Sequence, residues 1–360
     1  MIFTTLIIPV NQSLLSLIHE AKFLSTCYPP PPPPTNPKAP NQTRKNVALN
    51  IARQSKMHGE WRYVMAHKEL VDINLIASAG SMGVGYNYPI YQFKHPNYTE
   101  NFTPEFRSFI DKHYNHSFEP LEVLGYIYAL LYSPNYRKRY EEFLKADYPK
   151  ILFTNNKDLF RALSLLGIEL IGLHVLNKES LNYSFEKLKD ATIGESCYKE
   201  VHERNPIIKK PLHNEPDQRL YINHSAYFSG VSQEIYDYRI GGYGVLDKYL
   251  KSHKDEPCDF DHVSNIIKVI ARTIEIQKTL GFLTSDLPHL KGNDSKALIQ
   301  EILQNPPPPP PPFNTNIALI LSRQAKASLD FDAAFISKEA SDLNISSGGG
   351  GTAFPLFCIT

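Results

Sequence analysis

Residues 125–137 have the sequence Gly-Tyr-Ile-Tyr-Ala-Leu-Leu-Tyr-Ser-Pro-Asn-Tyr-Arg. Leu121 and Leu124 just before it share a helical face with Tyr128 and Leu131 of the stretch, which predicts a helix with an apolar stripe. Ser133-Pro134 then has the pattern of an N-cap followed by a proline in the first helical turn. A second helix is therefore predicted to begin there, with one side formed by Tyr136, Tyr140, Phe143 and Leu144.

Helix signals continue on both sides of this stretch. Thr103-Pro104 is again a cap followed by a proline, and Asn156 precedes a leucine-rich run. Residues 262–280 carry a further apolar stripe at helical spacing. Upstream, residues 46–93 alternate apolar and polar positions and are broken by glycines, which predicts short strands and a loop. The sequence therefore predicts an α+β fold, with mixed short strands followed by a helical body.

Two proline runs, residues 29–34 and 306–312, divide the chain. Proline has no N–H and fixes φ, so each run predicts an extended polyproline II spacer. A ligand for a proline-binding domain is the alternative interpretation. The predicted organisation is an N-terminal extension with a spacer (1–44), one main domain (45–290), a linker with a spacer (291–312) and a C-terminal segment (313–360).

The segments that follow the two proline runs are related in sequence. At a constant offset of 270 residues, Asn46-Val47-Ala48-Leu49 corresponds to Asn316-Ile317-Ala318-Leu319, and Arg53-Gln54-Ser55-Lys56 corresponds to Arg323-Gln324-Ala325-Lys326. After a glycine loop that is four residues shorter in the second copy, Tyr88-Pro89-Ile90-Tyr91 corresponds to Phe354-Pro355-Leu356-Phe357. Matches at constant spacing indicate an internal repeat. Residues 313–360 are therefore predicted to be a truncated second copy of the 46–91 segment.

The charge of the chain is balanced, with 38 basic and 37 acidic side chains. A protein that binds nucleic acid through bulk phosphate attraction alone is usually more basic than this. DNA binding by this chain would therefore depend on partners or on contacts to base edges for part of its affinity.

Cysteine and apolar patterns indicate a protein of the reducing cytoplasm. The four cysteines lie far apart and form no CxxC pair, which argues against a zinc ribbon and a disulfide framework. The apolar residues 1–10 lack a basic flank and are predicted to form a buried strand or helix instead of a signal peptide. No run approaches the roughly 18 apolar residues of a membrane span. The thirteen histidines form no HxH or HxxxH pair, and His174 is predicted to be a hydrogen-bonding residue at a helix end, without a metal.

Several blocks of this sequence resemble the type ISP restriction–modification family. Residues 125–137 resemble its "YIYAVLHSPxYR" block, and Tyr148-Pro149-Lys150-Ile151 follows as it does in the family. Residues 240–251 resemble "VGGYxVxxKWLKxR", although Tyr249 stands where tryptophan is usual. Arg53-Gln54 resembles part of a "TRQ" segment, and residues 88–91 resemble "FPLY". The blocks occur in the family order over about residues 45–285.

The resemblance implies a C-terminal specificity domain, which in this family follows an adenine-N6 methyltransferase domain. Such a domain grips the duplex and reads base edges while an adenine is flipped out. The catalytic motifs themselves are not found: residues 80–85 open no convincing helix for S-adenosylmethionine, and Asn305-Pro306-Pro307 runs into more proline without an aromatic residue. No nuclease array or Walker lysine is found either. We expect no cofactor in this chain, and S-adenosylmethionine in a catalytic partner domain.

Base reading requires Arg, Lys, Asn or Gln side chains presented on a rigid element, because their donors and acceptors match base edges. Arg53, Gln54 and Lys56 are the first candidates, since they cluster and recur in both copies of the repeat; a solvated strand end is the alternative. The other candidates for DNA contact are basic residues near predicted element ends: Arg137, Lys138, Arg139, Lys209, Lys210, Arg239, Lys248 and Lys251.

Each of these other candidates has an ordinary structural alternative. Residues 137–139 are expected early in a helix, where their charge opposes the helix dipole unless an anion lies nearby; a solvated helical face is the alternative. Residues 209–210 lie in a predicted surface loop. The glycines Gly241-Gly242, flanked by Arg239, Lys248 and Lys251, either let the backbone approach DNA or permit a tight bend. The tyrosine-rich helices are predicted to be mostly core, with a stacking platform for bases as the alternative.

The predicted function is sequence-specific recognition of double-stranded DNA for an adenine-N6 DNA methyltransferase of a restriction–modification system, with a methyltransferase subunit supplied in trans. The alternative is a protein-interaction module or an inactive remnant of a truncated gene. A continuous basic groove that includes Arg53 and Lys56 would favour DNA, and a neutral or acidic surface would favour the alternative.

Overall fold

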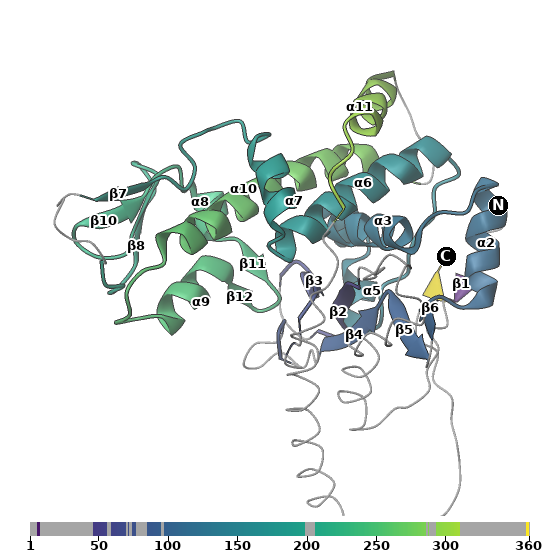
Figure 1. Cartoon of the computed structure of the whole chain (residues 1–360), viewed down its shortest axis with the longest axis horizontal. Coiled ribbons are helices and arrows are strands. Elements are labelled where there is room, and N and C mark those ends of the chain that lie inside the picture. Colours follow the sequence, from purple (N-terminus) through teal and green to yellow (C-terminus); the bar gives the residue numbers. More distant parts are fainter. Residues whose placement is uncertain are drawn as a thin grey trace, which may run out of the picture.

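The computed structural model describes the following residues: 6–7, 46–55, 59–69, 71, 74–76, 85–94, 97–198, 206–285, 287, 293–309 and 358–359. They form small antiparallel sheets and a larger helical part, so the predicted α+β class is confirmed (Figure 1). Residues 313–357 lie outside the described part of the chain, and so does the proposed second copy of the repeat except for β13 (Cys358–Ile359), which pairs with β1 (Leu6–Ile7).

The first sheet has β2 (Ala48–Ala52) at its centre, between β3 (Val64–His67) and β4 (Gly85–Pro89). Every residue of β2 is buried, as expected for a central strand covered on both faces. A hairpin of β5 (Tyr91–Lys94) and β6 (Asn97–Glu100) follows. The short strands predicted within residues 46–93 are thereby confirmed.

The predicted helix starts coincide with side-chain caps. Helix α2 (Pro104–Tyr114) is capped by Thr103, α4 (Pro134–Arg139) by Ser133, and α6 (Lys157–His174) by Asn156. Each cap side chain accepts a hydrogen bond from the backbone N–H three residues later, which satisfies one of the unpaired donors of the first turn. The other helices of this region are α3 (Pro120–Tyr132), α5 (Glu141–Ala146) and α7 (Lys178–Phe185).

Two details of the predicted helices are wrong. Helix α3 is buried well beyond the predicted stripe: residues 123–132 are all buried, because the helix is enclosed by the first sheet and by other helices. The helix predicted to continue through Tyr140 instead breaks there into α4 and α5. As a result Phe143, predicted on an apolar face, is 65 % exposed.

Helices α3 and α6 cross in direct backbone contact. A Cβ atom added to Gly167 would overlap the Gly125 carbonyl group, and one added to Gly125 would overlap the Ser164 carbonyl oxygen. Small residues therefore allow the two helix axes to approach more closely than larger side chains would permit. This contact is the centre of the helical body.

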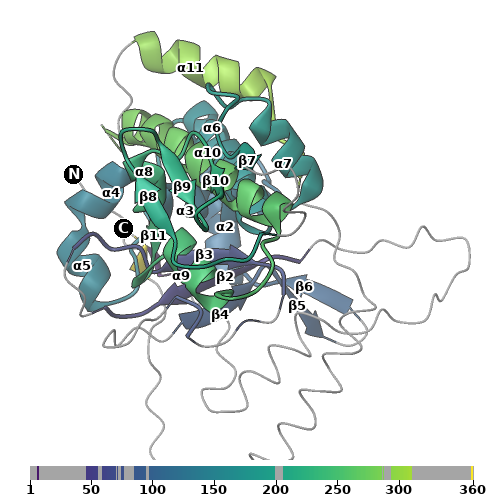
Figure 2. The same ribbon diagram turned by 90° about the vertical axis from the view of Figure 1, so that its left-hand side faces the viewer.

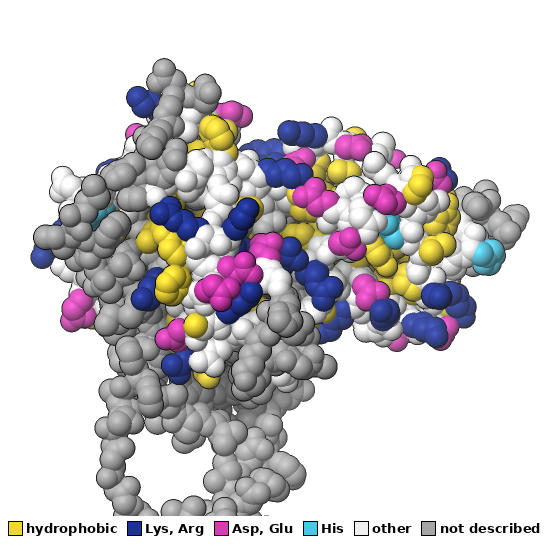
Figure 3. Space-filling model, turned by 180° about the vertical axis from the view of Figure 1, so that it is seen from behind, with side chains coloured by type: hydrophobic (Ala, Val, Ile, Leu, Met, Phe, Trp, Pro, Cys, Tyr) yellow, Lys and Arg dark blue, Asp and Glu magenta, His cyan; other side chains and the backbone are white. Residues whose placement is uncertain are grey.

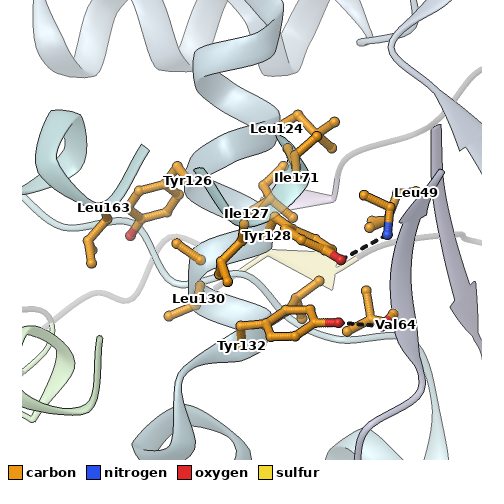
Figure 4. Close-up of a cluster of buried hydrophobic side chains, with 14 of the residues drawn as sticks. Leu49, Val64, Leu124, Tyr126, Ile127, Tyr128, Leu130, Tyr132, Leu163 and Ile171 are labelled. Atoms are coloured by element: carbon orange, nitrogen blue, oxygen red, sulfur yellow. Dashed lines mark hydrogen bonds between the residues drawn. The ribbon is translucent and has the colours of Figure 1, made fainter. Parts of the chain in front are cut away.

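Tyrosines of α3 attach the helical body to the first sheet. The Tyr128 hydroxyl accepts a hydrogen bond from the Ala66 N–H at 2.9 Å, and the Tyr132 hydroxyl donates to the Val64 carbonyl at 3.1 Å. Figure 4 shows both rings pointing from α3 toward the strands, whereas Tyr126 points to the opposite side near Leu163. The prediction that these tyrosines form core is confirmed for all three, since each is almost completely buried.

The second part of the chain adds a four-stranded antiparallel sheet in the order β7-β10-β9-β8. Its strands are β7 (Ser196–Tyr198), β8 (Leu212–Asn214), β9 (Arg219–Tyr221) and β10 (Ala226–Phe228). Helix α8 (Gln233–Tyr236), the hairpin of β11 (Arg239–Ile240) and β12 (Tyr243–Gly244), α9 (Val245–Ser252) and the long α10 (Phe260–Thr284) follow. This sheet lies with α8 and α9 at the left of Figure 1, away from the first sheet.

Helix α10 joins two hydrophobic cores. Ile276, Leu280 and Leu283 pack in the core of the first sheet and the helical body. Val263 and Ile267, earlier in the same helix, pack in the core beneath the four-stranded sheet. The helix predicted for residues 262–280 is confirmed and extends slightly beyond both predicted ends.

The predicted linker at 291–312 is only partly a linker. Residues Asn293–Gln304 form helix α11, in which Ile299 is 2 % exposed and packs in the first core. In Figures 1 and 2 α11 lies on the far side of α6 from the first sheet. Residues 306–309 of the proline run lie in neither a helix nor a strand, and their role as a spacer stays a prediction.

Candidate functional site

Arg53 follows β2 directly and is held at the surface by its neighbours. Its Nε donates to Asp147 Oδ1 at 2.9 Å, and its guanidinium carbon lies 6.0 Å from the centre of the Tyr148 ring. The hydrogen bond to Asp147 and the charge of that carboxylate raise the pKa of Arg53 above its already high value. Gln54 is also exposed, and Ser55 N–H donates to the Lys145 carbonyl at 3.0 Å. The candidate side chains are therefore presented from an anchored strand end.

Tyrosines form one side of this strand end. Burial raises the pKa of Tyr148 to about 12, and the Tyr88 hydroxyl donates to the Tyr148 hydroxyl at 3.1 Å. Tyr86 packs edge-on against Tyr148 with ring centres 5.9 Å apart, and it is itself exposed. Arg53 thus lies beside the buried Tyr148 ring, against which the exposed Tyr86 packs; sequence reasoning did not single out Tyr86.

The glycine turn of β11 and β12 reaches the same end of the first sheet. Gly241 N–H donates to the Arg62 carbonyl at 2.9 Å, while Ala52 N–H donates to the Tyr63 carbonyl at 3.1 Å. Gly241 has φ 55°, and a Cβ there would overlap the Ile76 carbonyl oxygen. The positive φ of Gly241 is that of a tight bend, one of the two predicted roles, and the backbone that the turn approaches is the protein's own; an approach to DNA stays a prediction.

One basic residue of the hairpin and one of α9 lie near this contact. Lys248 Nζ lies 3.8 Å from the centre of the Tyr243 ring, and the Tyr243 hydroxyl donates to the Leu75 carbonyl at 2.5 Å. Arg239 is exposed and donates to the Gly242 carbonyl at 2.6 Å. We define the β2-end surface as the side chains of these two segments and their neighbours: Arg53, Gln54, Arg62, Tyr86, Arg239 and Lys248.

Neither Lys56 nor Lys251 is assigned to the β2-end surface. Lys56 lies outside the described residues. Lys251, one helical turn after Asp247 in α9, pairs with that carboxylate at 2.8 Å. The Asp247 carboxylate holds the Lys251 ammonium on the helix surface.

Arg137 lies inside the protein. It is 2 % exposed, its Nε donates to the Leu131 carbonyl at 2.6 Å, and its guanidinium carbon lies 4.6 Å from the centre of the Tyr132 ring. Glu60 approaches to 3.5 Å. A guanidinium occupied in this way is a structural group, and Arg137 therefore does not belong to the candidate surface.

The dipole argument for residues 137–139 is also wrong. Helix α4 has six residues and ends at Arg139, so these cations lie in its last turn, where positive charge is favourable. No anion is needed to explain them. Lys138 and Arg139 are exposed, with Arg139 5.6 Å from the Tyr140 ring centre.

Lys209 and Lys210 lie in a loop before β8, as predicted. Lys209 pairs with Asp255 at 3.0 Å, and both side chains are well exposed. These two lysines lie in the loop next to the four-stranded sheet and are not part of the β2-end surface.

The outward face of the four-stranded sheet carries a group that sequence reasoning missed. Tyr221 and Tyr227 are cross-strand neighbours with ring centres 5.2 Å apart, and Arg219 lies over Tyr227 at 4.5 Å. Leu220 and Phe228 on the other face are buried. The alternation Arg219-Leu220-Tyr221-Ile222 was the signal for this strand, but three-residue strands are too short for periodicity to stand out.

Charges of both signs are mixed on the face seen in Figure 3. Lys and Arg side chains there are interspersed with Asp and Glu. No continuous basic patch covers the described residues of that face, in keeping with the balanced charge of the whole sequence.

The role predicted for His174 is confirmed. At the end of α6, its Nδ1 lies 2.7 Å from the Tyr128 hydroxyl and its Nε2 lies 3.1 Å from the Thr273 hydroxyl. Burial, and secondarily the charge of Arg137, lowers the pKa of His174 to about 3. The imidazole is therefore neutral and serves as an internal hydrogen-bonding group.

The described residues carry neither a metal cluster nor a single membrane-spanning helix. In that part of the chain there is no group of three or more His, Cys, Asp or Glu side chains placed to hold a metal ion. There is likewise no single helix long and apolar enough to cross a membrane, although the bent pair α6 and α7 passes by length and composition taken together.

These observations define a mixed α+β module with a polar, cation-bearing surface at one end of a small sheet. The chain belongs to the Type ISP C-terminal specificity domain family, whose model matches residues 29–280. The predicted family is thereby confirmed. No curated protein matches the chain.

The solved structures to which the chain is similar include two Type ISP restriction–modification enzymes and one further protein–DNA complex. A nuclease-deletion mutant of the Type ISP restriction–modification enzyme LlaGI, in complex with a DNA substrate mimic, has 21 % identity and a TM-score of 0.45, covering 69 % of this chain and 22 % of that chain. The ATP-dependent Type ISP enzyme LlaBIII bound to DNA has 19 % identity and a TM-score of 0.49, covering 70 % and 16 %. The DrdV–DNA complex has 16 % identity and a TM-score of 0.49, covering 75 % and 26 %. The chain thus spans about a quarter or less of their length.

Proposed function

We propose that this chain recognises a specific sequence of double-stranded DNA on behalf of an adenine-N6 methyltransferase of a restriction–modification system. The family supplies the class of function, since a specificity domain selects the site at which such an enzyme acts. The observation that carries the proposal is the β2-end surface, where the turn of β11 and β12 is hydrogen-bonded through Gly241 to Arg62 beside the end of β2 that bears Arg53 and Gln54.

The chemistry of the β2-end surface suits base edges. Arg53 and Gln54 offer a guanidinium and an amide, which pair in bidentate fashion with guanine and adenine in the major groove. Arg53 donates its Nε to Asp147, which leaves the two terminal nitrogens directed away from that contact. Arg239 of the neighbouring hairpin and Lys248 of α9 supply positive charge for phosphate. The hydrogen bonds from Gly241 to the Arg62 carbonyl and from Tyr243 to the Leu75 carbonyl hold the turn of the hairpin against the residues near the first sheet.

Catalysis in this proposal belongs to a partner. The sequence carries no recognisable glycine-rich S-adenosylmethionine motif and no target-base loop, so a methyltransferase domain or subunit in trans would bind the cofactor and the flipped adenine. The cytoplasm, where the host DNA lies, is the compartment that this role requires.

The proposal is tested by comparing two exposed ion pairs of the same length. Arg53 and Asp147 are 2.9 Å apart and 45 % and 60 % exposed; Lys278 and Glu234 are also 2.9 Å apart and 67 % and 58 % exposed. Arg53→Ala is expected to weaken binding to duplex DNA and relax selectivity at one base pair, by roughly 1–3 kcal/mol. Lys278→Ala, on α10, is expected to change neither. Equal effects of the two variants would show that only net charge matters.

The mixed charges seen in Figure 3 favour a second candidate, a module that docks on another protein. In that case the chain would bind a methyltransferase subunit and have no measurable affinity for duplex DNA at low salt. Titration of labelled duplex with the isolated chain separates the two functions, because specific readers of DNA also retain salt-sensitive non-specific binding.

A further inference from the structure

A row of side chains crosses the outward face of the four-stranded sheet. Directly opposite residues of antiparallel strands point to the same face. The register therefore places Cys197, Tyr227, Tyr221 and Leu212 in one line across β7, β10, β9 and β8. Leu212 is 64 % exposed, and the other three are partly exposed. The inward face is closed, because its side chains pack with those of α8, α9 and α10 in the second core.

Two tyrosines and an arginine form the centre of this face. The ring centres of Tyr221 and Tyr227 are 5.2 Å apart, and the ring planes are inclined by 45°. The guanidinium carbon of Arg219 lies 4.5 Å from the centre of the Tyr227 ring, within the range of a cation–π contact. Nucleobases stack on tyrosine rings and on guanidinium planes, and such stacking tolerates any base. The group therefore offers two adjacent stacking surfaces.

Basic side chains lie at one end of the row. Lys209 N–H donates to the Ile222 carbonyl at 2.8 Å, so this lysine lies beside the end of β9 that carries Tyr221. Lys209 pairs with Asp255 at 3.0 Å. Lys210, the next residue, is exposed and forms no ion pair within the described part of the chain. This end of the row therefore suits a phosphate group.

The size of the face decides which kind of ligand it can hold alone. Four strands about 4.8 Å apart, each of three residues with a rise of about 3.3 Å, define a face of roughly 150 Å². A stable protein–protein interface needs about 800 Å² from each partner. The face is therefore too small to hold a protein by itself, whereas its two stacking surfaces match one or two unpaired bases.

We propose that the outward face of the four-stranded sheet binds a short unpaired stretch of nucleic acid. One base stacks on Tyr221, a second stacks on the pair of Tyr227 and Arg219, and a phosphate lies at Lys210. Paired bases do not fit, because their ring faces are covered by their neighbours in the duplex. The sheet lies away from the first sheet (Figure 1), and the inference goes beyond the proposed reading of duplex DNA without resting on it.

Fluorescence anisotropy of short labelled oligothymidine and oligouridine strands, titrated with the full chain, tests the site. Tyr221→Ala and Tyr227→Ala are each expected to weaken binding about 10-fold, because base–aromatic stacking is lost. Tyr221→Phe and Tyr227→Phe keep the ring and are expected to stay within about twofold of the wild type. The control is Tyr183→Ala on α7, which removes a tyrosine whose ring centre also lies close to a cation, 3.9 Å from Lys187 Nζ; it is expected to change nothing.

Alkylation of Cys197 gives a second readout at the site itself. Cys197 lies directly opposite Tyr227, so a bound strand is expected to slow its alkylation several-fold. Peptide mass mapping separates Cys197 from the other cysteines. The protection is expected to be lost in Tyr227→Ala and kept in Tyr227→Phe.

Binding of either strand supports the proposal, and the tighter of the two shows whether the ligand is DNA or RNA. The proposal is overturned if neither strand binds, which would leave the face as part of a larger protein contact. It is also overturned if the alanine variants bind as the wild type does, if the phenylalanine variants lose as much affinity as the alanine variants, or if unlabelled duplex competes as well as unlabelled single strand.

Discussion

At the scale of single residues, Arg137 and Lys138 are sequence neighbours in α4 that have different surroundings. Arg137 is enclosed by the Leu131 carbonyl, Glu60 and the Tyr132 ring, whereas Lys138 is exposed. Arg137→Ala is expected to lower the free energy of unfolding by about 1–3 kcal/mol, because a buried carbonyl loses its donor and the cation–π contact is lost. Lys138→Ala is the matched control and is expected to leave it within about 0.5 kcal/mol. Urea unfolding of both variants measures the difference; equal midpoints would contradict the structural role of Arg137.

His174 makes stability depend on pH. The folded protein binds no proton at His174 until about pH 3, whereas the unfolded chain binds one below about pH 6.5. The stability contributed by this burial is therefore complete above pH 6.5 and is lost as the pH falls toward 3, by about 1.4 kcal/mol per unit. Urea unfolding between pH 7 and 5 is expected to show this slope in the wild type and a smaller slope in His174→Gln. Identical slopes would mean that the imidazole is solvated.

At the scale of elements, two glycines in helices offer a sharp comparison. Gly167 of α6 touches the backbone of α3, so Gly167→Ala is expected to force the helices apart and lower the free energy of unfolding by about 1–3 kcal/mol or more. A Cβ added to Gly281 of α10 would meet only Pro134, at 3.9 Å. Gly281→Ala is expected to be neutral or to stabilise by up to about 1 kcal/mol, through helix propensity. Thermal or urea unfolding of both variants measures these changes. An unchanged free energy of unfolding in Gly167→Ala would contradict the close crossing of α3 and α6.

Elements with local signals were predictable from the sequence. Thr103, Ser133 and Asn156 mark helix starts through a side chain that bonds three residues ahead, so the information is contained in a few neighbouring residues. The break at Tyr140 and helix α11 were missed, since both depend on packing against distant parts of the chain. Helix α11 is short, and its apolar side chains acquire a partner only when α6 is in place.

The candidate site was predictable in its residue types but not in its assembly. Arg53, Gln54, Arg239 and Lys248 were selected as polar groups near strand ends and turns. The placement of the β11–β12 turn beside the first sheet involves contacts such as the hydrogen bonds from Gly241 to Arg62 and from Tyr243 to Leu75, which no sequence pattern encodes. Burial of Arg137 was equally invisible, because a cation in a basic run is normally expected at the surface.

At the scale of the whole molecule, α10 couples the two cores. Tyr238 and Val245 pack against both, and α10 contributes side chains to both. Unfolding is therefore expected to be one cooperative transition. The fluorescence of Trp61, the single tryptophan, reports the first core, and the reactivity of the buried thiol of Cys258 reports the second. Coincident urea midpoints are expected; midpoints that differ by more than the error would show two independent units.

The balanced charge of the molecule makes specificity, more than affinity, the property to measure. The central claim is that the chain reads DNA sequence, and selection from random duplex DNA by the purified chain at two salt concentrations tests it most directly. The account predicts one enriched motif that persists at the higher salt, because contacts to base edges are less salt-sensitive than contacts to phosphate. Binding that disappears with salt and enriches no motif would contradict it.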